Sequence, residues 1–161
     1  MKIALVRIDE RLIHGQVTLG WSRTVSANLI LAVNDLVAQD SLQKKLMMMA
    51  APVGVTIEIY SIDEVVEKLN ANTWPNANIL LLLRNPIDMV RLIEKGVQVP
   101  KINVGGVRSP GATIKLTKEV IATPDELAAW KQLDELGIRI EVQWVPNQGL
   151  TVLNDIIRKR G

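Results

Sequence analysis

Short apolar runs of strand length alternate along this chain with longer amphipathic segments, and no other sequence feature restricts the fold as strongly. The runs cover residues 2–8, 27–33, 55–60, 78–84, 100–104 and 138–145. The fourth, NILLLLR, is apolar almost throughout, as expected of a strand that is covered on both faces of a sheet. Strands that alternate with helices are typical of βαβ units. The pattern therefore predicts an α/β fold, a three-layer sandwich with helices on both faces of a central, mostly parallel sheet of six to seven strands.

The amphipathic segments carry helix start and stop signals. Ser61 with Glu64 and Thr123 with Glu126 have the spacing of capping boxes, and Pro86 occupies the first position of a further helix. These signals predict helices that begin at residue 12 or 14 and end near 23, and others at 38–50, 61–70, 86–96, 124–136 and 150–160. Residues 113–122 fit either one strand or a small hairpin. The strand at 138–145 alternates and fits a sheet edge.

A methionine triplet occupies residues 47–49 in the predicted helix 38–50. Leu42, Leu46 and Met49 lie at spacings that put them on one helix face. Only part of the triplet can point the same way, so we expect it to fill the core rather than to form a partner-binding stripe. The tryptophans are also expected to be packing residues.

Composition fits one domain over residues 1–161. With 161 residues, 48% of them hydrophobic, the chain can bury one core but is too short for two ordinary domains. Cysteine is absent, which excludes disulfides and thiolate metal sites. A net charge of +2 and 3% aromatic residues do not match the basic, aromatic-rich surface of nucleic-acid binders, so no nucleic-acid partner is expected. The first residues resemble neither a signal peptide nor a membrane span, and we expect a cytoplasmic location.

Polar residues follow the ends of several predicted strands. They are residues 9–15, Asn34 and Asp35, Arg84 and Asn85, and residues 103–106. In open parallel sheets, ligands bind at the carboxyl ends of the strands. The sequence therefore predicts a functional site at this edge.

The stretch RIDERLIHGQV, residues 7–17, follows the first strand and holds His14, the only histidine. It lacks the glycines of a phosphate-binding loop, which excludes nucleotide binding by that route. The HExxH, CxxC and DxDxDG patterns are absent from the chain. A lone imidazole without thiolates makes a poor metal site, and we expect no bound metal.

The residue types around His14 suit phosphoryl transfer. A neutral imidazole can act as base or nucleophile, and a carboxylate usually orients it. Asp9 and Glu10 are both candidates for that carboxylate. Arginine forks match phosphate oxygens, and Gly15 would let backbone N–H groups approach the same anion. These residues predict a phosphoryl group that passes through His14.

Two other interpretations fit the same residues. The charged stretch could be a solvated set of ion pairs, with His14 bridging loop and helix. Alternatively, His14 could be the general base of a hydrolase or isomerase that needs no partner protein. The residue types alone leave these alternatives open.

The motifs taken together resemble the IIB subunits of the mannose/fructose/sorbose class of the bacterial phosphoenolpyruvate-dependent sugar phosphotransferase system. RIDERLIHGQV is similar to the family's N-terminal signature. Similar features follow in family order: Trp21, the Asn34-Asp35 stretch, Ala51-Pro52, NPID at 85–88, NVGG at 103–106 and LxxxGIRIExQxVP at 133–146. Val107 departs from the methionine that usually follows the glycine pair, which we interpret as a packing change.

The resemblance implies an enzyme, a protein-Npi-phosphohistidine–sugar phosphotransferase. His14 would accept a phosphoryl group from the phosphohistidine of a IIA domain, through Nδ1, and pass it to a sugar held by the membrane IIC/IID permease. Asp9 and Arg11 carry over as the residues that flank the histidine. No metal, nucleotide or other cofactor would be required.

Further residues are candidates for phosphate or partner contacts. They are Arg7, Gly15, Gln16, Asn34 and Asp35. The strand can direct Arg7 away from the site, and Gln16 and Asn34 fit equally well as caps of backbone groups at turns.

The resemblance also implies a place in the cell and a class of substrate. The protein would associate with the inner face of the membrane through the permease, and the sugar would be mannose, fructose, sorbose or an N-acetylated amino sugar. A homo-oligomer remains open. The alternative within the same fold is a regulatory or binding module in which phosphorylated His14 only signals.

Overall fold

The computed structural model describes residues 1–160, apart from the side chains of Gln16 and Val17. Seven strands form one sheet in the order β10-β9-β5-β1-β4-β2-β3. All neighbours pair in parallel except β10, which is antiparallel to β9. The strands are β1 (Lys2–Ile8), β2 (Leu29–Val33), β3 (Thr56–Tyr60), β4 (Asn78–Leu83), β5 (Lys101–Val104), β9 (Arg139–Val142) and β10 (Thr151–Val152).

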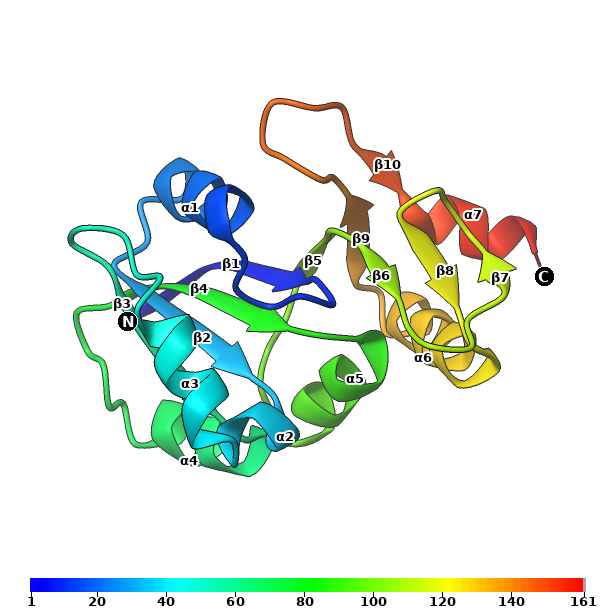
Figure 1. Cartoon of the computed structure of the whole chain (residues 1–161). Coiled ribbons are helices and arrows are strands. Elements are labelled where there is room, and N and C mark those ends of the chain that lie inside the picture. The colour runs from blue at the N-terminus through cyan, green and yellow to red at the C-terminus, as the bar shows by residue number, and fades with distance from the viewer. Residues whose placement is uncertain (161) are drawn as a thin grey trace.

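Helices cover both faces of this sheet, which confirms the predicted three-layer sandwich (Figure 1). The helices are α1 (Gly15–Thr24), α2 (Asp35–Ala38), α3 (Ser41–Met48), α4 (Ile62–Asn70), α5 (Pro86–Glu94), α6 (Pro124–Glu135) and α7 (Leu153–Lys159). The helices α1 to α3 pack on one face and α4 to α7 on the other. Across residues 1–160, none of these helices has the length and apolar character that a membrane span requires.

The strand β4 lies in the interior of the sheet, between β1 and β2, and is buried on both sides. Leu80 and Leu82 point into the cluster beneath α1 to α3, whereas Ile79, Leu81 and Leu83 point into the opposite cluster. Side chains of a strand alternate between the two faces, so an unbroken apolar run is what this position requires.

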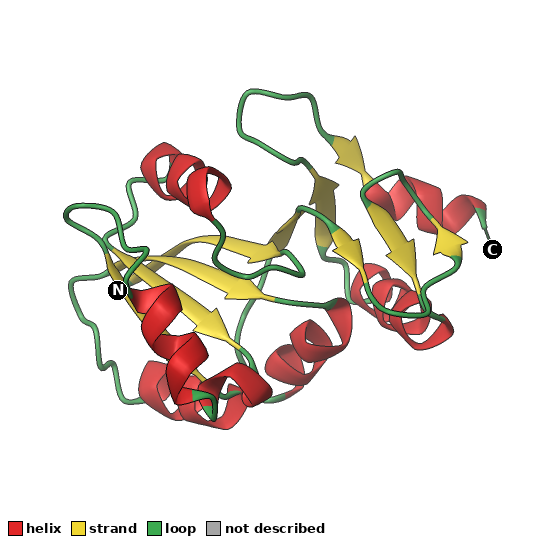
Figure 2. Ribbon diagram, in the orientation of Figure 1, coloured by secondary structure: helices red, strands yellow, loops and turns green. Residues whose placement is uncertain are grey.

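The segment 113–122 forms the hairpin alternative rather than one strand. The strands β7 (Ile114–Lys115) and β8 (Val120–Ala122) pair antiparallel, and β6 (Val107–Arg108) joins β8 in parallel to complete a second, small sheet. Figure 2 shows this sheet beside α6 and β9. The sequence predicts that residues 138–145 form an edge strand, and this is wrong. Their strand, β9, is the second in the sheet, because β10 lies outside it.

The predicted helix 38–50 corresponds to α3, and a separate short helix, α2, precedes it. Asn34 is the N-cap of α2 and Asp40 is the N-cap of α3, and each accepts backbone N–H groups of the helix that it starts. Leu42, Leu46 and Met49 do share a face, but that face is exposed to solvent. The expectation that the methionine triplet fills the core is therefore wrong for Met48 and Met49, and only Met47 packs against the core. Helical spacing defines a common face but not the side on which the sheet lies.

Candidate functional site

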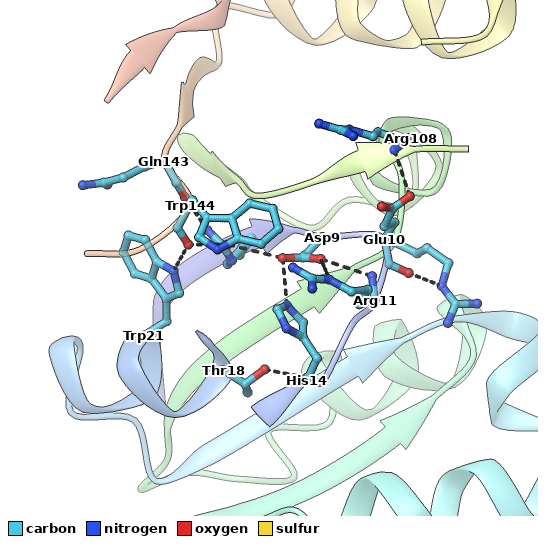
Figure 3. A network of polar contacts seen from close by, with 11 residues as sticks. Asp9, Glu10, Arg11, His14, Thr18, Trp21, Arg108, Gln143 and Trp144 are labelled. Atoms are coloured by element: carbon cyan, nitrogen blue, oxygen red, sulfur yellow. Dashed lines mark hydrogen bonds and ion pairs between the residues drawn. The ribbon is translucent and has the colours of Figure 1, made fainter. Parts of the chain in front are cut away.

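The candidate site lies in the loop that connects β1 to α1, at the carboxyl edge of the sheet (Figure 3). Backbone N–H groups of the loop bind neighbouring strand ends: Asp9 N donates to Leu83 O at 2.9 Å, and Glu10 N donates to Gly106 O at 2.9 Å. Arg84 Nε donates to Glu10 O at 2.8 Å. The loop is therefore held by the chain after β4 on one side and by the chain after β5 on the other. Both segments belong to the polar residues that the sequence places at this edge of the sheet.

Leu12 anchors the middle of the loop in the core. Its side chain is buried in the cluster beneath α1 to α3, and its backbone has φ +55, a left-handed conformation that costs a leucine conformational energy. Because Leu12 turns inward, the chain emerges from the core just before His14.

Asp9 orients the imidazole of His14. Nε2 of His14 lies 3.1 Å from Asp9 Oδ2, and the Asp9 side chain is 1% exposed. An ionised carboxylate only accepts hydrogen bonds, so this contact places the ring proton on Nε2. Nδ1 then carries the lone pair, and no hydrogen bond to it occurs within the described part of the chain. The ring is 19% exposed, which leaves it accessible to an incoming group.

The first turn of α1 faces the same place. His14 is the N-cap residue, but its side chain binds Asp9 instead of capping the helix, and the first turn carries no acidic residue. Backbone N–H groups in a first helical turn have no partner within the helix and carry partial positive charge. Gly15, the first residue of α1, has φ +47, which glycine adopts at little cost. An uncapped helix start beside a free imidazole nitrogen can accommodate phosphoryl oxygens.

Arg7 holds Asp9 from the interior. Its side chain is 2% exposed and donates to Asp9 Oδ2 at 3.3 Å, to Asn103 Oδ1, and to the carbonyls of Gln143 and Trp144 at 2.9 and 3.0 Å. Burial lowers the pKa of Arg7 to about 10, so the guanidinium remains charged at neutral pH. With its donors engaged inside the protein, Arg7 acts on Asp9 and on the chain after β9 rather than on an exposed anion.

Asp9 remains ionised although it is buried. Burial alone would raise the pKa of its carboxyl group, but hydrogen bonds from His14 and from the Arg11 N–H outweigh that effect, together with the charges of His14 and Arg7. The net shift of the Asp9 pKa is downward. The site therefore keeps a negative charge next to Nε2 at neutral pH.

Arg11 is the arginine on the solvent side. Its side chain is 44% exposed, its Nε lies 3.7 Å from Asp9 Oδ1, and its Cζ lies 4.6 Å from the ring centroid of Trp144. The two arginines near Asp9 therefore occupy different positions. Arg7 is buried behind the carboxylate, and Arg11 lies at the exposed mouth of the site.

The remaining predicted residues lie apart from this arrangement. Asn34 accepts hydrogen bonds from Leu36 N and Val37 N, which makes it the cap of α2. Asp35 accepts from Ile62 N at 2.9 Å and pairs with Arg91 at 3.0 Å, contacts that tie α2 to α4 and α5. Both follow β2, which β4 separates from β1 in the sheet, and their predicted contacts with phosphate or a partner stay predictions. The Gln16 side chain lies outside the described part of the structure, and its predicted contact stays a prediction.

Glu10 is not the carboxylate that orients His14. Its Oε2 accepts from Arg108 N at 2.8 Å, which links the loop to β6. Of the two carboxylates that the sequence left open, the structure assigns the orienting position to Asp9.

Comparisons with known proteins identify the family of this chain. The family model described as "PTS system sorbose subfamily IIB component" matches residues 3–161. The chain belongs to this family. The crystal structure of the IIBSor domain of the sorbose permease from Klebsiella pneumoniae has a TM-score of 0.92 and 33% identity to this IIB chain, and the match covers 100% of this chain and 99% of that one.

Relatives of this IIB chain are named for several sugars. The sorbose-specific EIIB component of Klebsiella pneumoniae is 34% identical over 90% of this chain and 88% of its own. The fructose-specific EIIB component of Bacillus subtilis is 33% identical over 98% and 97%. The mannose-specific EIIAB component of Escherichia coli is 34% identical over 99% of this chain but 49% of its own length. The family membership gives this chain a phosphotransfer role in a sugar phosphotransferase system.

Sequence reasoning missed the part of this IIB site that comes from the C-terminal third. Gln143 and Trp144 contribute backbone carbonyls, and Trp144 contributes its ring, although the sequence suggested only packing. Every residue has a backbone carbonyl, so the sequence cannot indicate which carbonyls accept hydrogen bonds in a site. The glycine pair Gly105 and Gly106 was the available signal, because each glycine has a site residue where a side chain would stand.

Replacement of Gly105 by alanine tests this close packing. An added Cβ would collide with Arg7 Nη2 and Asp9 Oδ2, two buried groups that cannot move apart without losing their contacts. We expect the free energy of unfolding, measured by urea denaturation, to fall by about 1–3 kcal/mol. Gly149→Ala is the matched control, since no atom lies within 4 Å of its added Cβ. Equal stabilities of the two variants would show that the glycine is not required.

Proposed function

We propose that this protein is a phosphocarrier and transferase that takes a phosphoryl group onto His14 Nδ1 from a phosphohistidine of a IIA domain and passes it to a sugar. One observation carries the proposal. The hydrogen bond from His14 Nε2 to Asp9 leaves Nδ1 as the nucleophilic atom, beside the start of α1, where the His14 side chain does not cap the helix. The proposal extends over residues 1–161 as one IIB domain.

The transfer needs little covalent chemistry from the protein. The Nδ1 lone pair forms a bond to phosphorus while the bond from phosphorus to the donor imidazole breaks, and that electron pair returns to the donor nitrogen. The product is a phosphorylated imidazolium ring, whose positive charge lies beside the Asp9 carboxylate. In the second step a sugar hydroxyl oxygen forms a bond to phosphorus while the bond from phosphorus to Nδ1 breaks. The electron pair of that bond returns to Nδ1, and the hydroxyl proton passes to solvent water. Catalysis of both steps consists of positioning and charge stabilisation.

Each remaining group has a defined contribution to these steps. Arg11, at the mouth, pairs with the phosphoryl oxygens as they pass in either direction. The N–H groups at the start of α1, including that of Gly15, face the same oxygens. Arg7 keeps Asp9 in place and ionised, and so acts on the reaction through that carboxylate.

The partners follow from the chemistry and from the relatives. One relative is named a mannose-specific EIIAB component, and this chain matches about half of it, which supports a IIA domain as the phosphoryl donor. We propose that the acceptor sugar is held by the membrane IIC/IID permease, which would keep this protein at the inner face of the membrane. Relatives named for sorbose, fructose, mannose and N-acetylgalactosamine support a hexose or N-acetylated amino sugar. No metal, nucleotide or nucleic acid takes part in the proposed steps.

Labelling with phosphate tests the proposal. Incubation with phosphoenolpyruvate, the general transfer proteins and the cognate IIA protein should add one phosphate that is labile to acid and stable to alkali, as a phosphoramidate is. Nuclear magnetic resonance of the ¹⁵N-labelled imidazole should place phosphorus on Nδ1. A phosphoester, or phosphorus on Nε2, would contradict the proposal.

A chase separates transfer from signalling. When membranes that contain the permease and its sugar are added, the label should leave the protein and appear on the sugar. Retention of the label on His14 would favour the regulatory module instead.

A further inference from the structure

We propose that Trp144 is a positioning residue that holds the Arg11 guanidinium at the mouth of the phosphoryl site. The inference rests on the proposed function and identifies a residue through which Arg11 acts. Trp144 follows β9 and reaches the loop between β1 and α1 across more than 130 positions of sequence, as Figure 3 shows.

The backbone of Trp144 is fixed by two site residues. Its carbonyl oxygen accepts a hydrogen bond from Arg7 Nη2 at 3.0 Å and another from Trp21 Nε1 at 3.1 Å. Trp21 belongs to α1, and Arg7 belongs to β1. The backbone from which the indole extends is therefore held by the two elements that flank the loop with Asp9 and His14.

The indole ring is also fixed, because Gly106 lies against it. An added Cβ at Gly106 would lie 2.9 Å from Cζ3 of Trp144. The ring therefore packs onto the glycine backbone at the start of the β5–β6 connection. Because both the backbone of Trp144 and one edge of its ring are held, the indole is a rigid surface on which another side chain can stack.

Arg11 rests on this surface, and its other restraint is weak. The Arg11 Cζ lies 4.6 Å from the Trp144 ring centroid, which is within the range of a cation–π contact. The ion pair of Arg11 Nε with Asp9 Oδ1 spans 3.7 Å, and that oxygen already accepts the Arg11 backbone N–H at 3.1 Å. A long side chain at 44% exposure loses considerable rotamer entropy when it is held in one place. The ring thus supplies much of the order that Arg11 needs before a phosphoryl group arrives.

A matching pair lies in the interior. Arg7 Cζ lies 4.9 Å from the ring centroid of Trp21, and Trp21 donates to the Trp144 carbonyl. The buried pair, Arg7 with Trp21, holds the Asp9 carboxylate in place. The outer pair, Arg11 with Trp144, places a guanidinium where the phosphoryl group would enter. Without its ring, the inner arginine keeps four other partners. Among the side chains that the structure describes, the outer arginine keeps only the long contact to Asp9.

Transfer kinetics test the proposal. With radiolabelled phospho-IIA protein as donor, Trp144→Leu should lower the second-order rate constant about three- to tenfold, the range expected when one cation–π contact is lost. Trp144→Phe keeps an aromatic face and should retain most of the rate. In an Arg11→Ala background, Trp144→Leu should have no further effect, because there is no guanidinium left to position.

A control and a second measurement separate positioning from packing. Trp74→Leu removes another partly buried indole, one that bonds Glu58 outside the site, and it should leave the rate unchanged. The Arg11 Nε–Hε resonance should be shifted upfield by the ring in the wild type and in Trp144→Phe, and should return to its ordinary position in Trp144→Leu.

Two results would overturn the inference. They are an equal slowing by Trp144→Leu in the wild-type and Arg11→Ala backgrounds, and an unshifted Arg11 resonance in the wild type. Failure of the wild type to accept phosphate would contradict the proposed function instead, and the Arg11 resonance would still report on the stacking.

Discussion

Replacement of Arg7 by alanine is expected to lower the free energy of unfolding by about 3–5 kcal/mol, the cost of removing one partner from a buried ion pair. The variant leaves the Asp9 carboxylate, which is 1% exposed, without its interior cation. It also removes the donor to Asn103 and to the Gln143 and Trp144 carbonyls. Urea denaturation at neutral pH, with the wild type measured alongside, gives the difference directly.

Arg11→Ala is the matched control for this experiment. Arg11 contacts the same carboxylate from the exposed side, and such exposed pairs contribute about 1 kcal/mol or less. Arg7→Lys should fall between the two, because an ammonium keeps the charge but cannot reproduce the guanidinium geometry. If Arg7→Ala cost no more than Arg11→Ala, the interior role assigned to Arg7 would be wrong.

Replacement of His14 by alanine should abolish phosphate incorporation while the protein stays folded. The imidazole supplies the only proposed nucleophilic atom, so mass spectrometry after incubation with phosphoenolpyruvate and the transfer proteins should find no added phosphate. The ring is partly exposed and contributes one hydrogen bond to a charged group, so the free energy of unfolding should fall by no more than about 1.5–3 kcal/mol.

His14→Gln sharpens this second test. A glutamine amide can donate to Asp9 in place of Nε2, but it offers no nucleophilic ring nitrogen. We expect it to be closer to the wild type in stability than His14→Ala and equally inactive in phosphate acceptance. Incorporation of phosphate into either variant would place the acceptor elsewhere in the chain.

The fold was largely predictable because its strands are signalled by local composition. The first predicted strand, residues 2–8, matches β1 at both ends, and the apolar run at 78–84 forms the interior strand β4, which is buried on both faces as expected. The helix predicted at 38–50 corresponds to α3, but it begins three residues later than predicted because Asp40 is its N-cap. The prediction that Met48 and Met49 fill the core was wrong for another reason. Periodicity does not indicate on which side of a helix the sheet lies.

The site was predictable only in its local part. Asp9 and His14 are five positions apart on one loop, and their contact follows from that proximity. Asn34 and Asp35 end a strand at the same edge, but strand order separates them from His14, and the sequence pattern does not determine that order. The contacts of Arg7 with residues 143–144 depend on the pairing of β5 with both β1 and β9, which is a property of the whole sheet.

The span between Arg7 and the carbonyls that it binds has a consequence for synthesis of the protein. Among the described strands, β1 is synthesised before the others, yet Arg7 binds carbonyls 136 and 137 positions later, on the far side of β5. A nascent chain that lacks those positions has His14 but not the frame that holds Asp9 and Arg11 around it. We therefore expect the site around His14 to be complete only after Gln143 and Trp144 have been synthesised.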